Sequence, residues 1–263
     1  MHLRMWPEHA VVVTDPQLVR ELLVTHHDAL VRWERGIRVF GEVHGHSVLI
    51  AEGGAWRDKR HALQPGFMPK AAQAAAREEV KRVLGGRAPT AQTRPLLRYL
   101  AQTLEETLRL YPAAPILISR RALRPIALGG WQLPARTLFM LPLQLMHDDP
   151  RWFSEPHAFR PERFDEAAPA VPRGAYMPFG TGPRVCLGQH LATTEMTVID
   201  AMLLQRFELA VPAGMAAPRP VLNVTLRPDR PLHLGIAAIS PDPVEGPRRD
   251  RSVTASPAPP TPE

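Results

Sequence analysis

The segment F-G-T-G-P-R-V-C-L-G-Q-H-L-A, residues 179–192, constrains the fold more than any other part of this 263-residue chain. Its cysteine, Cys186, is the single one in the sequence, so no disulfide can form within the chain. Gly180 and Gly182 suit the positive-φ backbone of a bulged hairpin. Residues 187–209 then read as a long helix. The sequence therefore places one thiol where a tight turn becomes a helix.

A cysteine at the start of a helix is well placed to bind a metal. The unpaired backbone N–H groups and the positive end of the helix dipole favour a thiolate, which is the metal-binding state. Arg184 adds a permanent cation that can meet an acidic group on the ligand, and Gly188 leaves room for a flat ligand. The alternative is that Cys186 is an ordinary buried thiol and the glycines only form a turn.

This segment resembles the cysteine loop of the cytochrome P450 family, the haem-thiolate monooxygenases. It matches the family pattern Phe-Gly-x-Gly-x-Arg-x-Cys-x-Gly at every specified position, including Gly180. The resemblance implies that haem b is the cofactor, with Cys186 as the proximal iron ligand that favours O–O cleavage. It also implies that Arg184 binds a haem propionate and that Phe179 packs near the sulfur.

Three further segments match the family in the expected order, and two of them together supply one predicted cluster. Glu106 and Arg109 lie three residues apart on a predicted helix, where they can pair with each other. The resemblance implies that this pair joins Arg163, in the later segment F-R-P-E-R-F, as a structural cluster. Taken alone, such a pair is usually a solvated helix face.

The third matching segment and several single residues give further candidates. Trp56 and Arg60 form the W-x-x-x-R pattern of the family's haem-contacting helix, and the alternative is a core tryptophan beside a surface arginine. By family analogy, Arg120 is a further candidate for a propionate. His147 and His157 are interpreted as surface or packing residues rather than ligands. With one cysteine and dispersed histidines, a zinc site is not expected.

The predicted fold is mainly α with a small β-sheet. Thirty prolines indicate many interrupted elements. The pattern predicts a strand at 10–14, a helix opening at Asp15, helices at 71–84 and from 96 to Pro112, short strands near 116 and 137–141, a Pro-rich meander at 149–178 and the helix at 187–209. In that last helix we expect Leu191, Val198, Met202 and Leu203 to be available for burial. Residues 1–240 form one domain, and the Pro-rich tail at 241–263 is predicted to be disordered.

One stretch departs from the family pattern. Arg60 and Glu106 are only 46 positions apart (106 − 60), far fewer than in full-length members. The comparison implies a partial fold that lacks the central distal helices, with a deletion junction near residues 70–77. The family's small-Gly-x-acid-Thr signature is not found, so no catalytic residue is identified.

The resemblance implies a monooxygenase that inserts one oxygen atom of O₂ into a small hydrophobic substrate. No flavin or nucleotide fingerprint is present, so electrons would come from a separate donor, a ferredoxin or a reductase. One alternative is a non-catalytic remnant that binds haem without activating oxygen, or does not bind it. Another is a thiol-based redox or interaction protein that uses Cys186, although the chain has no resolving cysteine.

The distribution of charged and apolar residues indicates which kinds of partner and which cellular compartment to expect. The net charge is +6 (32 − 26), but the arginines are scattered among acidic residues, so no nucleic acid is expected. The N-terminal residues M-H-L-R lack the apolar core of a signal peptide, and the apolar stretch at 138–146 is short and interrupted. With one cysteine, these features predict a cytoplasmic protein without a membrane span.

Overall fold

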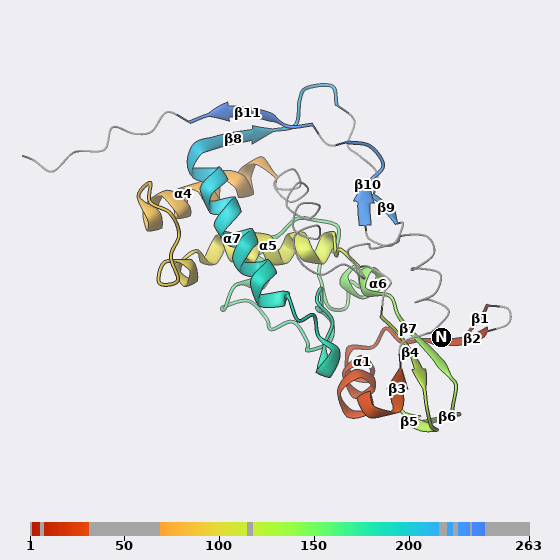
Figure 1. The fold of residues 1–263 in the computed structure, drawn as a ribbon. Helices are drawn as coiled ribbons and strands as arrows, with labels where there is room; N and C mark the ends of the chain where they lie inside the picture. Colours follow the sequence, from red (N-terminus) through yellow and green to blue (C-terminus); the bar gives the residue numbers. More distant parts are fainter. Residues whose placement is uncertain are drawn as a thin grey trace, which may run out of the picture.

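The computed structural model describes residues 2–5, 8–31, 69–114, 118–215, 220–222, 226–231 and 233–239. Figure 1 shows a mixed architecture, with the helices α4, α5 and α7 grouped together and the largest sheet at some distance from them. The predicted junction at 70–77 lies within helix α4. Trp56, Arg60 and the tail at 241–263 lie outside the described residues.

The largest sheet has five strands in the order β1-β2-β7-β4-β3. Their bounds are β1 His2–Met5, β2 Glu8–Val12, β3 Leu30–Val31, β4 Ile118–Ala122 and β7 Leu138–Leu141. Strands β2 and β7 pair in parallel, and the other neighbours are antiparallel. The strands predicted at 10–14 and 137–141 correspond to β2 and β7. The short strand predicted near 116 corresponds to β4, which starts at Ile118.

Small antiparallel ribbons make up the rest of the β-structure. Strands β5 (Ile126–Leu128) and β6 (Trp131–Leu133) form a hairpin, β8 (Phe207–Ala210) pairs with β11 (Gly235–Ala238), and β9 (Pro220–Leu222) pairs with β10 (Leu226–Pro228). The hairpin turns at the two glycines between β5 and β6. Together with the main sheet, these ribbons make the β-content larger than the single small sheet predicted.

The first helix begins where the sequence predicts it. The Asp15 carboxylate accepts the backbone N–H groups of Gln17 and Leu18, at 3.0 and 3.1 Å, and so caps helix α1 (Pro16–Arg20). The chain continues as a π-helical turn, η1 (Glu21–Thr25), and a short 3₁₀ turn, η2 (His27–Ala29).

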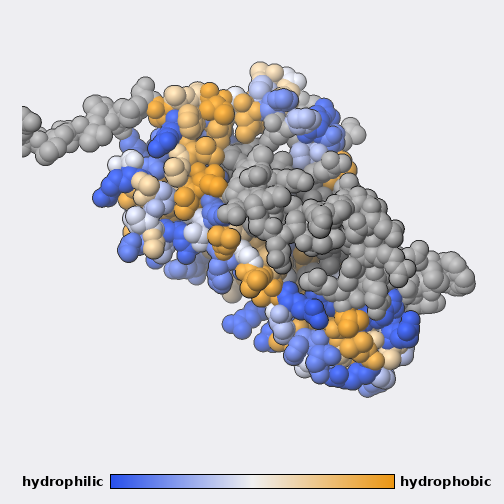
Figure 2. Space-filling view, viewed as in Figure 1, coloured by the Kyte–Doolittle hydropathy of each residue, from blue (hydrophilic) through white to orange (hydrophobic). Residues whose placement is uncertain are grey.

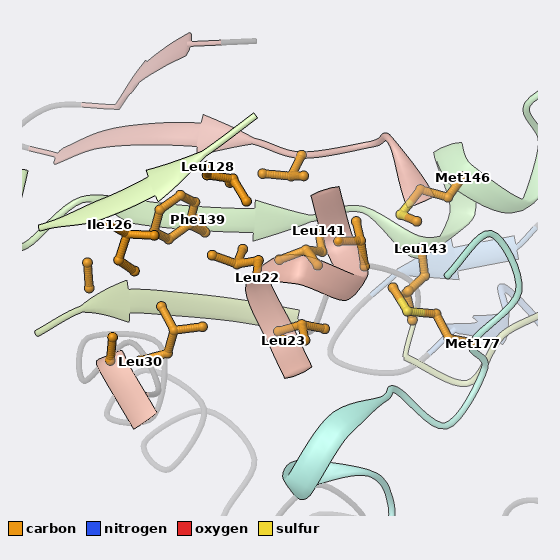
Figure 3. Close-up of a cluster of buried hydrophobic side chains, with 14 residues drawn as sticks. Leu22, Leu23, Leu30, Ile126, Leu128, Phe139, Leu141, Leu143, Met146 and Met177 are labelled. Carbon is orange, nitrogen blue, oxygen red and sulfur yellow. The ribbon is translucent and has the colours of Figure 1, made fainter. Parts of the chain in front are cut away.

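The main apolar core lies between this helical segment and the sheet. Figure 3 shows Leu22 beside Leu141 of β7, and Leu23 and Phe139 belong to the same buried cluster. Met177, from the meander, belongs to the same cluster. The core therefore joins the N-terminal segment to residues close to the cysteine loop.

Three helices form the other part of the molecule. They are α4 (Lys70–Leu84), which ends at Gly85, α5 (Arg98–Leu110) and α7 (Gln189–Arg206). A short helix, α6 (Leu143–His147), follows β7. The 3₁₀ turns are η4 (Arg94–Leu96), η5 (Pro161–Phe164) and η6 (Gly182–Arg184). No described helix is long and apolar enough to cross a lipid bilayer.

Helix α7 differs from its prediction at both ends. It stops at Arg206 because Phe207 and the following residues pair with β11. Leu191, which we expect to be available for burial, is 55% exposed, while Met196 and Leu204 are buried. Val198, Met202 and Leu203 are half-buried. The buried face of α7 is therefore rotated from the one that the leucines indicate.

An aspartate lies within the buried face of α7. Asp200 is 4% exposed, and its Oδ2 accepts no hydrogen bond in the part of the chain that the structure describes. Met196 and Leu204, four residues away on either side, belong to the two apolar clusters between the helices. Burial raises the pKa of Asp200 from 3.8 to about 7. The protonated acid is therefore the favoured form in the folded protein below neutral pH.

Replacing Asp200 by Asn should remove a pH dependence of stability. Because the folded-state pKa lies above the unfolded value, the contribution of the protonated acid is complete below about pH 4 and is lost as the pH rises through about 7. The difference in unfolding free energy between the parent and D200N should change by up to about 4 kcal/mol across this range.

Urea unfolding at a series of pH values measures this difference. The comparison also cancels the opposite effect of His147, whose pKa is lowered to about 4 mainly by burial. The exposed Asp165 provides a control, because D165N should keep the parent's pH profile of stability between these pH values. Parallel stability curves for D200N and the parent would refute the assignment.

Candidate functional site

A buried ion cluster joins helix α5 to the meander. Arg109 donates from Nε to Glu106 Oε2 at 2.7 Å and from Nη2 to Oε1 at 2.8 Å. Arg163 donates from Nε to Glu106 Oε1 at 3.0 Å, and the backbone N–H of Arg160 donates to the same oxygen at 2.9 Å. The side chains of Glu106 and Arg109 are fully buried. The structure therefore brings the three predicted cluster residues together around one carboxylate.

His147 extends this cluster toward the cysteine loop. Arg109 Nη1 donates to the His147 carbonyl at 2.8 Å, and His147 Nδ1 lies 3.1 Å from the Arg109 carbonyl. The backbone N–H of Met177 donates to Nε2 at 3.3 Å, so Nδ1 carries the proton. Burial lowers the pKa of His147 to about 4, which keeps the imidazole neutral for this double role.

The sequence pattern does not reveal this role of His147. It groups the residue with His157 as a surface or packing residue, whereas the structure buries His147 and leaves His157 exposed. A histidine that links two backbone segments has no spacing signature. The one available signal is its position in the apolar segment L-M-H at the end of α6.

The cysteine loop has the tight backbone that its glycines predict. Gly180 and Gly182 have φ angles of 78° and 77°. The Cys186 N–H donates to the Phe179 carbonyl at 3.0 Å, closing the loop just before α7 begins. The Phe179 side chain packs against the apolar cluster of Leu104, Leu108 and Met196. The loop is thus tied to both α5 and α7.

A close backbone approach fixes the loop against the N-terminal segment. A Cβ added to Gly182 would lie 2.4 Å from the Leu23 carbonyl oxygen in η1. At Gly174, earlier in the meander, a Cβ would lie equally close to the Pro16 carbonyl oxygen. Both positions also have positive φ, so two separate constraints require glycine there.

Cys186 is exposed, in contrast to an ordinary buried thiol. Its neighbours Val185 and Leu187 are 42% and 100% exposed, and Leu191 lies one turn into the helix. Figure 2 shows apolar surface along the course of α7. A Cβ added to Gly188 would lie 3.9 Å from the cysteine sulfur, at ordinary van der Waals distance, so Gly188 lies directly beside the sulfur. The exposed cysteine is therefore flanked in the chain by exposed apolar side chains, which a hydrophobic ligand could contact.

The remaining site candidates have different surroundings. Arg184 is exposed in η6, and its side chain forms no ion pair or hydrogen bond with another described residue. Arg120 lies on β4, opposite Phe139 of β7, and its Nη1 donates to the Ser119 carbonyl at 2.8 Å. The structure thus places Arg184 on the cysteine loop and Arg120 in the main sheet.

Comparisons with known proteins agree with the geometry. The family model "Cytochrome P450" matches residues 69–234, which include α4, α5, the meander and the cysteine loop. The chain is 39% identical over 140 residues to cytochrome P450 4d2 of Drosophila melanogaster, and 38% identical over 161 residues to cyclooctatin synthase of Streptomyces melanosporofaciens. It is also 40% identical over 161 residues to 11-oxo-beta-amyrin 30-oxidase of Medicago truncatula.

The matched part is a minor portion of each relative. These alignments cover 53%, 60% and 59% of this chain but 27%, 35% and 30% of the relatives, in the same order. The chain therefore spans about a third of the length of the curated relatives it matches. Trp56 and Arg60 lie outside the family match.

Replacing Arg109 by Ala should strongly destabilise the fold. The substitution removes both Arg109 hydrogen bonds to the buried Glu106 carboxylate, which keeps only Arg163 and the Arg160 N–H, and it also removes the link to the His147 carbonyl, so we expect a loss of about 3–5 kcal/mol. Arg98 on the same helix is the control, because it is exposed and its 3.4 Å pair with Glu166 is also exposed. Chemical denaturation of both variants measures the difference. Equal midpoints for R109A and R98A would contradict the proposed role of the cluster.

Replacing Gly182 by Ala should destabilise the protein more than replacing Gly86. Both glycines have positive φ, 77° and 82°, but a Cβ at Gly86 meets nothing within 4 Å. The strain of positive φ is thus common to both variants, and only G182A places a methyl group against the Leu23 carbonyl. Thermal melts should show a lower midpoint for G182A than for G86A. The reverse order would exclude a tight contact between the cysteine loop and η1.

Proposed function

The chain belongs to the cytochrome P450 family, and on that premise we propose that it binds haem b through the Cys186 thiolate and acts as a monooxygenase. The reaction inserts one oxygen atom of O₂ into a small hydrophobic substrate. The second oxygen atom leaves as water after the uptake of two electrons and two protons. The observation that carries the proposal is the exposed Cys186 just before α7, flanked in the chain by the exposed apolar side chains of Val185 and Leu187.

The residues around Cys186 suit haem. A thiolate is the donor that a haem-thiolate iron takes, and Cys186 is the single cysteine of the chain. The adjacent Val185 and Leu187 side chains provide apolar contacts for the flat face of a porphyrin. Gly188 lies beside the sulfur, since a Cβ there would be in van der Waals contact with it at 3.9 Å, and glycine presents the least bulk to a flat ligand at this position. When bound, the haem iron supplies the oxygen chemistry that the protein side chains lack.

In this proposal the chain's own residues position and neutralise the cofactor. Arg184 is a permanent cation two residues from Cys186, and its exposed guanidinium, which has no ion-pair or hydrogen-bond partner among the described residues, is available to bind a propionate. The Phe179 carbonyl accepts the Cys186 N–H and so fixes the backbone that carries the sulfur. Arg120, and Trp56 and Arg60 outside the described residues, are further candidates for contact with the cofactor.

The substrate and the electron donor are inferred only by class. The name of one relative, steroid 17-alpha-hydroxylase/17,20 lyase of Cavia porcellus, refers to a steroid, which is largely hydrocarbon. This agrees with a hydrophobic substrate. The sequence carries no flavin or nucleotide fingerprint, so we assign the electrons to a separate ferredoxin or reductase.

A second candidate function is haem binding without oxygen activation. It is favoured by the short interval between Arg60 and Glu106 and by the missing small-Gly-x-acid-Thr signature. Without that segment, no acid–hydroxyl pair is identified for proton delivery to oxygen. This alternative also includes a non-catalytic protein that does not bind haem.

Replacing Cys186 by Ala or Ser should abolish thiolate ligation. Haem-reconstituted parent protein should show the shifted Soret band of a thiolate-bound ferrous–CO complex, and C186A and C186S should lose it. Circular dichroism provides the folding control, because Cys186 is exposed and its replacement should leave the fold intact. An unchanged ferrous–CO spectrum in either variant would refute ligation by this sulfur.

Turnover driven by a peroxide then distinguishes the two candidate functions. A peroxide supplies the oxygen atom and both electrons, so the assay needs no reductase. Oxidation of a hydrophobic probe by the parent but not by C186A supports the monooxygenase. A thiolate spectrum without any turnover supports the non-catalytic alternative.

A further inference from the structure

Helix α4 carries polar side chains that reach both of its neighbouring helices. Gln73, Arg77 and Glu79 are buried or half-buried, in contrast to exposed residues of α4 such as Glu78 and Arg82. Their hydrogen bonds go to backbone groups at the start of α5 and at the end of α7. These are helix ends, where backbone groups have no partner within the helix.

Glu79 caps the first turn of α5. Its two carboxylate oxygens accept the backbone N–H groups of Tyr99 and Leu100, each at 2.9 Å. The residue at the N-cap position of α5 is Leu97, whose side chain cannot accept a hydrogen bond. The Glu79 carboxylate from α4 therefore caps α5 in place of an N-cap side chain, and its negative charge complements the helix dipole.

Arg77 binds the C-terminal end of α7. Its Nε donates to the Leu204 carbonyl at 3.2 Å and its Nη2 to the Phe207 carbonyl at 3.1 Å, at the C-terminus of α7. Nη2 also donates to Gln73 Oε1 at 2.9 Å. A cation at the carbonyl end of a helix again has the sign that the dipole favours.

Gln73 completes the contact where α7 becomes a strand. Its Nε2 donates to the Leu209 carbonyl and its Oε1 accepts the Leu209 N–H, both at 3.1 Å. The side-chain amide thus binds both backbone groups of one β8 residue, as a neighbouring strand would. This pair binds the chain to α4 just after α7 ends.

From these contacts we infer that Gln73, Arg77 and Glu79 are positioning residues, which set the placement of α7, the helix that follows Cys186, relative to α5. The inference rests on the proposed function, because the placement matters for the haem ligand. Neither α5 nor α7 has a capping hydrogen bond from the side chain of its own N-cap residue. Glu79 and Arg77 therefore connect two otherwise separate helix ends through one rigid element.

The length of α7 makes its far end sensitive to this contact. Eighteen residues give a helix about 27 Å long. Arg77 and Gln73 act at the C-terminal end, whereas Cys186 precedes the N-terminal end. A tilt of a few degrees at Arg77 would therefore move the sulfur by more than an ångström. The ion cluster holds the loop itself, and α4 holds the helix that follows it.

The test measures the distance between the two helices in the full-length, haem-free chain. One nitroxide is attached to the exposed Cys186 and a second to a cysteine introduced at the exposed Ala101 of α5. Pulsed electron–electron double resonance then gives the distance distribution. R77A and E79Q are compared with the matched controls R82A and E78Q, which alter exposed residues of α4.

We expect R77A and E79Q to shift or broaden this distribution, and R82A and E78Q to retain that of the parent. In E79Q, an amide donor replaces one acceptor and faces a backbone N–H, although the side-chain shape is kept. This variant therefore tests the inference even if R77A fails to fold by circular dichroism. Parent-like distributions in folded R77A and E79Q, or equal changes in the controls, would overturn the inference.

Haem-loaded protein gives a second readout that separates this inference from the proposed function. The two positioning variants should lose part of the thiolate-type ferrous–CO signal at a temperature where their circular dichroism matches the parent. If these residues only stabilised the fold, the variants would have a lower melting midpoint, but the folded protein would keep the full thiolate-type ferrous–CO signal. If the parent itself shows no thiolate signal, the proposed function fails, while the distances in haem-free protein still decide the positioning role.

Discussion

The Glu106 carboxylate is buried between the guanidinium groups of Arg109 and Arg163, and the placement of the meander depends on this cluster. Removing two opposite charges from water is costly, and the arrangement is stable because the carboxylate accepts several hydrogen bonds at once. The cluster joins residues that lie far apart in the sequence. Through His147 it also reaches Met177, just before the cysteine loop begins.

Backbone contacts between the cluster and the thiol then fix the position of the cysteine loop. Gly182 brings the loop against the Leu23 carbonyl, which connects the cysteine segment to the core beneath the main sheet. The Phe179 carbonyl holds the Cys186 N–H, and α7 starts directly afterward. The loop that carries the sulfur is thus held by contacts to η1, through Gly182, and to α5 and α7, through the Phe179 side chain. This arrangement is the physical basis for assigning a ligand to an exposed cysteine in an apolar setting.

Features that are local in sequence could be predicted, and features that depend on tertiary contacts could not. The Asp15 cap, the bounds of α4 and the positive φ of Gly180 follow from short-range chemistry. The pairing of Glu106 with Arg109 follows from helical spacing, and Arg163 from family resemblance. The link through His147 and the capping of α5 by Glu79 join distant segments without a spacing signal.

Helix α7 shows why the pattern alone misleads. The leucines suggest its buried face, but a ligand-facing surface is also apolar, so Leu191 can be apolar and exposed. Its end at Arg206 is set by the pairing of β8 with β11, and Gln73 and Arg77 bind the chain there. Asp200 is the reverse case, a polar residue within a buried face. In both cases the environment, rather than the residue type, decides burial.

The central claim is that the Cys186 sulfur is the ligand of a haem iron. X-ray absorption at the iron K-edge of the haem-loaded parent protein tests it most directly, because sulfur and nitrogen scatterers are distinguished in the first coordination shell. The account predicts one sulfur neighbour together with the porphyrin nitrogens. A first shell of nitrogen and oxygen alone would contradict it.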